Sequence, residues 1–150
     1  MCDVLLENMA DVNAVGGGGK TPLYRAVSRE LLDVVRKMLE VYGGNPNVGS
    51  PMLALAFEMR NMELVHLLLK HGADPNKATE SFEPSKHHRL PLHMAGGNSE
   101  LVELLLKHGA NAEVRDIDGN TALHHAVERG QLKVCEIFLE NNCRRDDGQQ

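Results

Sequence analysis

One six-residue pattern recurs along the chain, and it constrains the fold more than any other feature of the sequence. The pattern typically starts with Thr, continues through Pro or Ala to Leu, and ends with a small Ala. Its clear copies are Thr21–Ala26, Leu90–Ala95 and Thr121–Ala126, and Pro51–Ala56 is a degenerate copy. A pattern that returns after some tens of residues indicates stacked, similar units.

A second pattern accompanies the first. Leucine-rich runs end in turns that combine Gly or Ala with Asn or Asp, of which Gly72–Asn76 and Gly109–Glu113 are the clearest, with weaker relatives at Met9–Asn13 and Gly43–Asn47. Thr can cap the start of a helix, Pro fits its first turn, and Gly can end a helix in a left-handed conformation. The two patterns together predict pairs of helices, with the recurring Ala placed where two helices approach closely.

These motifs resemble the ankyrin repeat, a unit of about 33 residues that carries the pattern T-P-L-H-x-A. The resemblance covers nearly the whole chain. It implies an all-α ankyrin-repeat solenoid of stacked helix-turn-helix units with short β-hairpin loops, here called fingers. The predicted array occupies residues 1–145, with a half repeat at 1–14, repeats at 15–47, 48–76, 77–113 and 114–145, and a tail at 146–150. Because Met1 aligns to the middle of a second helix, we expect a piece of a longer array.

Several positions depart from the repeat pattern. The turn between the two helices should contain Gly, as at Gly130, but Glu30 and Arg60 stand at the equivalent positions. If both adopt the left-handed conformation, each costs on the order of 1 kcal/mol. Residues 96–98 read Gly-Gly-Asn in a shortened unit, so its first helix should end early. Residues 77–89 form an insertion, and insertions in repeat proteins often lie on the binding face.

Composition narrows the classes of function. The formal net charge of −5 argues against nucleic-acid or anionic-membrane binding, which favours a basic surface. The chain shows neither an apolar run of membrane-spanning length nor the basic and apolar regions of a signal peptide. Its three cysteines form no CxxC pair and align with small or apolar positions, which predicts buried free thiols. We therefore expect an intracellular protein of the cytoplasm or nucleus that is monomeric in isolation.

No enzyme site is evident, and we predict no catalytic residues, metal ligands or cofactor. An enzyme or metal protein would need convergent reactive groups. In the ankyrin family, a His at the position of His93 and His124 forms hydrogen bonds between repeats. His66 and His125 lie on predicted helices without a Cys or a paired carboxylate at ligand spacing. The Gly-rich run before Lys20 lacks the strand and the glycine spacing of a phosphate-binding loop.

The resemblance implies a protein–protein interaction module that presents a concave surface to a partner protein or peptide, as part of a larger scaffold or regulatory protein. Ile117 and Phe82 are the expected anchors, because apolar and Arg side chains dominate interface energies. The full set of predicted partner-binding residues is Lys20, Arg29, Glu58, Met59, Phe82, His87, His88, Arg89, Ile117, Asp118, Asn120, Glu128 and Arg129.

An alternative function is that the array is a substrate of an asparagine hydroxylase. Finger asparagines with a Leu eight residues upstream resemble known hydroxylation sites in the ankyrin family. Asn13 with Leu5, and Asn76 with Leu68, match this spacing.

Overall fold

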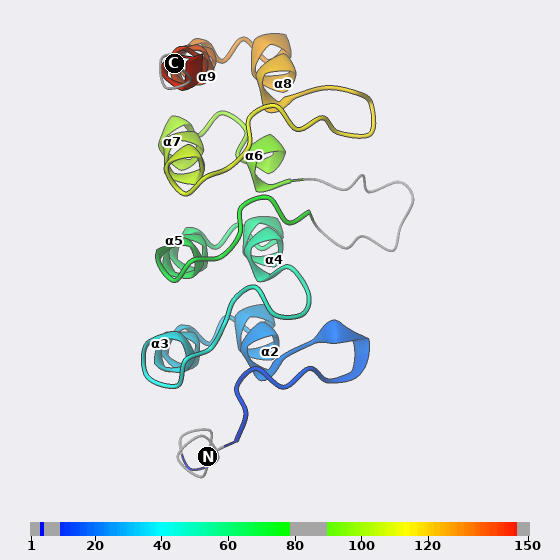
Figure 1. Cartoon of the computed structure of the whole chain (residues 1–150), viewed down its shortest axis with the longest axis vertical. Coiled ribbons are helices and arrows are strands. Elements are labelled where there is room, and N and C mark those ends of the chain that lie inside the picture. Colours follow the sequence, from blue (N-terminus) through cyan, green and yellow to red (C-terminus); the bar gives the residue numbers. More distant parts are fainter. Residues whose placement is uncertain (1–3, 5–9, 79–89, 147–150) are drawn as a thin grey trace. The chain divides into compact units, whose positions relative to one another are not determined.

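The chain folds into successive pairs of helices joined by short turns (Figure 1). The computed structural model describes residue 4, residues 10–78 and residues 90–146, with side chains described only as far as residue 142 in the last helix. Contacts divide the chain into two compact units, Met1–Asp74 and Pro75–Gln150. The described residues form helices and no β-strand, in agreement with the predicted all-α class.

The first unit contains two described helix pairs. Helix α2 (Pro22–Ser28) is paired with α3 (Leu32–Glu40), and α4 (Met52–Glu58) is paired with α5 (Met62–Lys70). Helix α2 packs against both α3 and α4. A short 3-10 turn, η1 (Gly17–Gly19), lies in the finger before α2.

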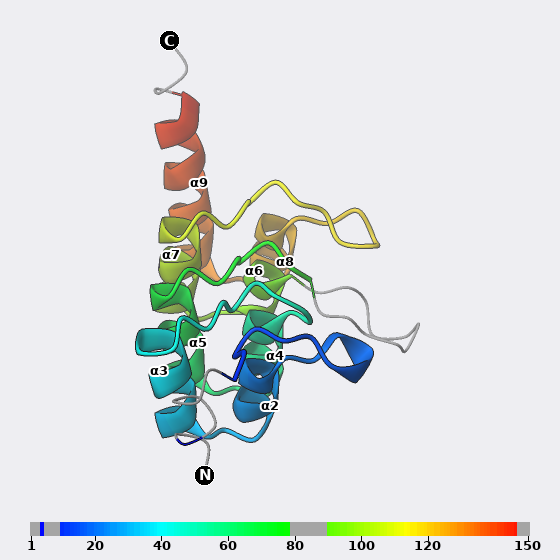
Figure 2. The same ribbon diagram turned by 60° about the horizontal axis from the view of Figure 1, so that its bottom comes forward.

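The second unit repeats this arrangement. Helix α6 (Pro91–Met94) is paired with α7 (Ser99–Lys107), and α8 (Ala122–Glu128) is paired with α9 (Leu132–Asp146). Helix α6 packs against α8, and α7 packs against α9. As predicted, α6 is short and ends at Met94, just before the Gly-Gly-Asn sequence at residues 96–98. Helix α9 has 15 residues, whereas α7 has 9 (Figure 2).

The helices start where the sequence supplies caps. Thr21 Oγ1 accepts a hydrogen bond from the backbone N–H of Tyr24 at 3.0 Å, with Pro22 in the first turn. Asn61 and Asn98 cap α5 and α7 in the same way, by accepting from the backbone N–H three residues on. Each cap satisfies a backbone donor that the helix itself leaves free.

The predicted core positions are buried in both units. Leu23, Leu53 and Leu92 are at most 4% exposed, and the recurring alanines at 26, 56, 95 and 126 are at most 6% exposed. Leu123, in the last pair, is half-buried instead. The repeated hexapeptide therefore supplies the apolar side of each first helix.

Two turns confirm the predicted backbone strain. Glu30 and Arg60 both adopt φ of 56°, close to the 65° of Gly130 at the same place in the last pair. The glycines expected to end second helices, at 43, 72 and 109, also have positive φ. The turn between paired helices thus requires one left-handed residue whatever the side chain.

The fingers are closed by backbone hydrogen bonds without regular strands in the described residues. Gly16 N–H donates to the Lys20 carbonyl in the first unit, and Asp116 N–H donates to the Asn120 carbonyl in the second. The shortened loop before α4 lies against the first finger, where Ser50 N–H donates to the Gly19 carbonyl at 2.9 Å.

Replacing Gly49 by Ala should destabilise the first unit by more than about 1–3 kcal/mol, the usual cost of one strained residue. Gly49 has φ of +77°, and an added Cβ would overlap the Gly19 carbonyl oxygen, which is held by Ser50. Gly43→Ala is the matched control, because Gly43 has φ of +66° but open space around it. Urea unfolding of both variants measures the difference, and equal losses would show that the predicted overlap is absent.

Candidate protein-interaction surface

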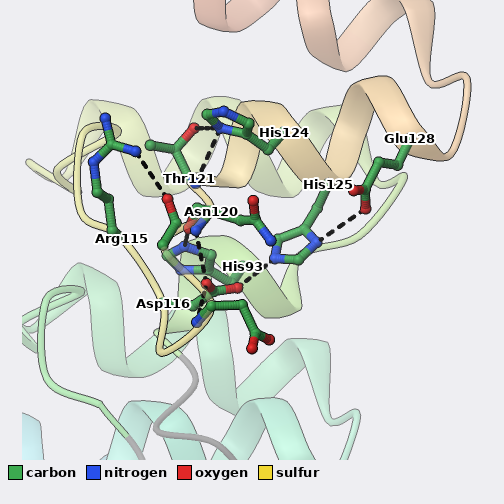
Figure 3. Close-up of polar contacts among 10 residues, drawn as sticks. His93, Arg115, Asp116, Asn120, Thr121, His124, His125 and Glu128 are labelled. Carbon is green, nitrogen blue, oxygen red and sulfur yellow. Dashed lines mark hydrogen bonds and ion pairs between the residues drawn. The ribbon is translucent and has the colours of Figure 1, made fainter.

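The finger at residues 114–120, in the second unit, is organised around one carboxylate. Asp116 Oδ1 accepts hydrogen bonds from the backbone N–H groups of Asp118 at 3.0 Å and Asn120 at 2.8 Å (Figure 3). Arg115 donates to the Gly119 carbonyl at 2.8 Å. An aspartate that accepts from nearby backbone donors is a common way to fix a turn.

The second oxygen of Asp116 ties the finger to α8. His125 Nε2 lies 2.6 Å from Asp116 Oδ2, and the two side chains are 25% and 11% exposed. His125 Nδ1 also lies 3.7 Å from a Glu128 carboxylate oxygen, one turn further along α8 (Figure 3). Asp116 therefore fixes the backbone of the finger and also joins the finger to α8, the helix that follows it.

A second histidine holds the base of the same finger. His93, on α6, is 3.3 Å from the Asn120 carbonyl oxygen through Nε2, and its ring makes an edge contact with His125 at 5.9 Å between centroids. Because a carbonyl can only accept, His93 must carry its proton on Nε2 for this bond. The finger is thus fixed from the preceding helix pair as well.

Two pKa values are shifted in this cluster. Burial lowers the pKa of His93 below 6.5, although its bond to the Asn120 carbonyl and the charge of Asp116 oppose the change. For Asp116, partial burial would raise the pKa, but hydrogen bonds from Asn120, His125 and Asp118 outweigh it and hold the pKa below its ordinary value. At neutral pH, Asp116 is therefore an anion and His93 is neutral.

The fixed finger presents exposed side chains. Ile117 at its tip is 69% exposed, and Asp118 is exposed beside it. Glu128 and Arg129, at the end of α8, are also exposed, whereas Asn120 is half-buried and engaged through its backbone. Of the predicted binding residues in this region, all but Asn120 are open to a partner.

The structure corrects the expected role of one histidine, His124. The sequence shows no Cys or paired carboxylate at ligand spacing from His125, but the fold brings the single carboxylate of Asp116, nine residues upstream, to it across the finger. His93 forms the expected bond to the next repeat, whereas His124 bonds within its own repeat, where its Nδ1 accepts from the Thr121 N–H at 3.2 Å. The Asp-x-Asp-Gly sequence at 116–119 was the available signal for a fixed turn.

The predicted residues of the first unit lie on its finger and at the ends of its first helices. Lys20 is exposed at the end of the finger, with its Nζ 5.7 Å from the centre of the Tyr24 ring. Arg29 and Glu58 are exposed at the ends of α2 and α4, and Met59 is half-buried. The remaining predicted residues, Phe82, His87, His88 and Arg89, lie outside the described residues.

A separate set of asparagines links successive turns. Asn13 donates to the Gly43 carbonyl at 3.2 Å and accepts from Asn45 N–H at 2.7 Å. Asn76, in the second unit, does the same with the Gly109 carbonyl at 3.0 Å and Asn111 N–H at 2.8 Å. The two predicted modification sites are therefore structural bridges between neighbouring repeats.

Asn47 is a third bridge that sequence reasoning missed. It donates to the Gly72 carbonyl at 2.8 Å and accepts from Asp74 N–H at 2.7 Å. The signal was present, because Leu39 lies eight residues upstream as in the other two cases. Glu113 holds the equivalent place in the last repeat, where it accepts from Asn142 at 3.3 Å.

Two other kinds of site are absent from the described residues. No group of three or more His, Cys, Asp or Glu side chains there could hold a metal ion, and no helix there is long and apolar enough to cross a membrane. Cys135 is a free thiol, but it is half-buried, not fully buried as expected. The side chains of Cys2 and Cys143 lie outside the described residues.

Lowering the pH below 6.5 should weaken the second unit through His93. Because the unfolded chain binds the proton at the ordinary pKa of 6.5 and the folded ring binds it only at lower pH, the contribution is complete above pH 6.5 and is lost as the pH falls toward the folded pKa. His93→Gln keeps a side-chain donor but cannot titrate. Urea unfolding from pH 8 to 5 should give a shallower loss for this variant, and parallel curves would contradict the assignment.

The sequence matches one family profile and several known proteins. A family profile of ankyrin repeats in three copies matches residues 1–79 and 56–147. E3 ubiquitin-protein ligase KEG of Arabidopsis thaliana is 30% identical over 97% of this chain, and alpha-latrotoxin-Lg1a of Latrodectus geometricus is 27% identical over 90%. Cyclin-dependent kinase 4 inhibitor B of Bos taurus is 35% identical over 82% of this chain and 93% of its own length.

The length of these relatives differs greatly. The match spans 10% of the ligase and 10% of the toxin. The profile nevertheless covers most of the chain, and the capped helix pairs, left-handed turns and fixed fingers occur where the repeat predicts them. The chain therefore belongs to the ankyrin-repeat family, as an all-α ankyrin-repeat solenoid with the general character of a protein-interaction module.

Proposed function

We propose that the fingers and first helices of this chain form a binding surface for a partner protein or peptide, with Ile117 as its main anchor. The observation that carries this proposal is the contrast within one finger. Its backbone is fixed by Asp116, His125 and His93, yet the side chain at its tip is 69% exposed.

A fixed loop is an efficient place for an anchor. Binding orders mobile groups at a cost of about 0.5–1.5 kcal/mol for each side chain, and a loop that is already fixed avoids much of the cost of ordering its backbone. An exposed Ile gains the free energy of burial when a partner covers it. Asp118 on the finger and Arg129 on α8 supply charges of both signs around this apolar centre, which matches the apolar core and polar rim of protein interfaces.

The first unit exposes predicted binding residues of its own. Lys20, Arg29 and Glu58 are exposed on its finger and first helices, and Met59 adds a partly exposed flexible side chain. We infer that the chain acts within a larger scaffold or regulatory protein, in an intracellular compartment. The match to only a tenth of two relatives supports the first inference, and the free thiol of Cys135 supports the second.

Ile117→Ser should weaken binding of peptide partners by roughly tenfold or more, because it removes the apolar anchor and leaves the finger backbone unchanged. The probe is a set of peptides selected on the unaltered protein from a displayed random library. Fluorescence polarisation measures their affinity for each variant. Val41→Ser is the matched control, since Val41 is 67% exposed at the end of α3 in the other unit. Equal affinities for Ile117→Ser and the unaltered protein would reject Ile117 as the anchor.

A second proposal concerns modification of the bridging asparagines. Asn13, Asn47 and Asn76 share one structural position, which supports treating all three as candidate substrates of an asparagine hydroxylase. Each of these asparagine amides donates one hydrogen bond to the turn of the next repeat and accepts one from it. We therefore expect the enzyme to act only after that turn opens locally.

Incubation with such a hydroxylase should add one oxygen to a peptide that contains Asn76, and the Asn76→Ala variant should lose that product. Peptide mass spectrometry locates the oxygen. Mild urea should increase the yield, because it opens the turn that occupies the asparagine. A complete lack of added oxygen on all three asparagines, with a control substrate fully converted, would reject the modification proposal.

A further inference from the structure

Helix α2 of the first unit carries a run of exposed cations. Lys20 precedes the residue that caps the start of α2, Arg25 lies within the helix, and Arg29 stands at its end, and all three are exposed. Residues 20–29 contain no acidic residue, although the whole chain has a net charge of −5. The three side chains, here called the basic strip, therefore follow α2 from its start to its end.

The charge of the basic strip is not used for contacts within the described chain. Arg25 and Arg29 are four residues apart, so they share one side of α2. Among the described residues, no carboxylate lies within ion-pair distance of either guanidinium. The next acidic residue, Glu30, is engaged elsewhere, because its carboxylate accepts a hydrogen bond from Asn61 Nδ2 at 2.7 Å. Both arginines therefore keep their hydrogen-bond donors for a partner.

Lys20 is held in place at the start of the strip. Its carbonyl accepts a hydrogen bond from Gly16 N–H at 3.0 Å, and the carbonyl of Gly19, just before it, accepts from Ser50 N–H at 2.9 Å. The Lys20 ammonium lies 5.7 Å from the centre of the Tyr24 ring. A residue whose backbone is already fixed loses less freedom when a partner binds. Lys20 is therefore suited to the recognition of a negative charge.

We propose that the basic strip binds a segment of a partner protein that carries Asp or Glu at alternate positions. The proposal rests on the binding surface put forward above, and it adds the chemistry of the partner. Side chains four apart on a helix are about 5–6 Å apart at Cβ, and alternate side chains of an extended segment are about 6.6 Å apart. Successive carboxylates of such a segment can therefore reach Arg25 and Arg29 in turn, and each guanidinium can hold a carboxylate through two N–H donors.

The arrangement of the strip favours a row of carboxylates over a single phosphate group. A phosphate is a compact anion that is bound best where several donors converge, whereas Lys20, Arg25 and Arg29 succeed one another along α2. Helix α4, which packs against α2, has the exposed carboxylate of Glu58 at its end. Like charges repel, so Glu58 disfavours a shift of the acidic segment from α2 toward α4. Both features direct the segment along α2.

Peptide selection on the full chain tests the basic strip. Peptides recovered from a displayed random library on the unaltered protein should include a class enriched in Asp and Glu. The double variant Arg25→Glu with Arg29→Glu should bind this class at least roughly tenfold more weakly in fluorescence polarisation. Lys70→Glu with Lys107→Glu is the charge-matched control and should bind normally, because both lysines are exposed at the ends of other helices. Circular dichroism confirms that each variant stays folded.

The outcomes separate this proposal from the proposed function. Peptides that bind through Ile117 without any class enriched in Asp or Glu would overturn the basic strip alone, as would acidic peptides that tolerate the changes at Arg25 and Arg29. A library from which no peptide binds would overturn both proposals.

Synthetic versions of one acidic peptide identify the anion. Replacing its Asp and Glu by Asn and Gln should abolish binding, and added salt should weaken the original peptide, because salt screens exposed charges. A version in which one phosphoserine replaces the whole row of carboxylates should bind more weakly. Equal or tighter binding of the phosphoserine version would overturn the assignment to carboxylates.

Discussion

Burial of an apolar side of each helix pair against a neighbouring pair is the interaction on which the rest of this structure depends. Full burial of a leucine such as Leu23 or Leu53 contributes about 1.5–3 kcal/mol, and the recurring alanines let the helices come close enough for that burial. One pair is too small to enclose such a core alone. Stability in a fold of this kind is therefore a sum over neighbouring pairs, and a side that lacks a neighbour keeps its apolar residues in water.

Polar contacts fix the conformation of the turns and fingers, which lie outside the apolar core. The turns between repeats leave backbone groups that need partners, and an asparagine amide can donate and accept at once. Asn13, Asn47 and Asn76 use both capacities on the turn of the next repeat. The contact between Asp116 and His125 fixes the finger of the last repeat in a comparable way. These contacts explain how loops that bury little surface still hold one conformation.

The helices, their caps and the left-handed turns could be predicted because each depends on residues close together in the sequence. Thr21 caps its own helix, and Glu30 adopts the conformation that the turn demands. The contact between Asp116 and His125 could not be found in this way, since it depends on the path of the finger between them. The exposure of Val127 was also beyond local reasoning, because burial depends on the neighbouring pair.

Fold and function are determined by different residues in such a chain. A change at Ala26 disturbs stacking, whereas a change at Ile117 leaves every buried contact in place. Exposed finger and helix residues can therefore vary without loss of the fold. Relatives that share 27–35% identity with this chain carry names as different as a ubiquitin ligase, a toxin and a kinase inhibitor. On the proposed binding surface, selectivity for a partner therefore comes from side chains that stability does not constrain, carried on a finger whose conformation the repeat fixes.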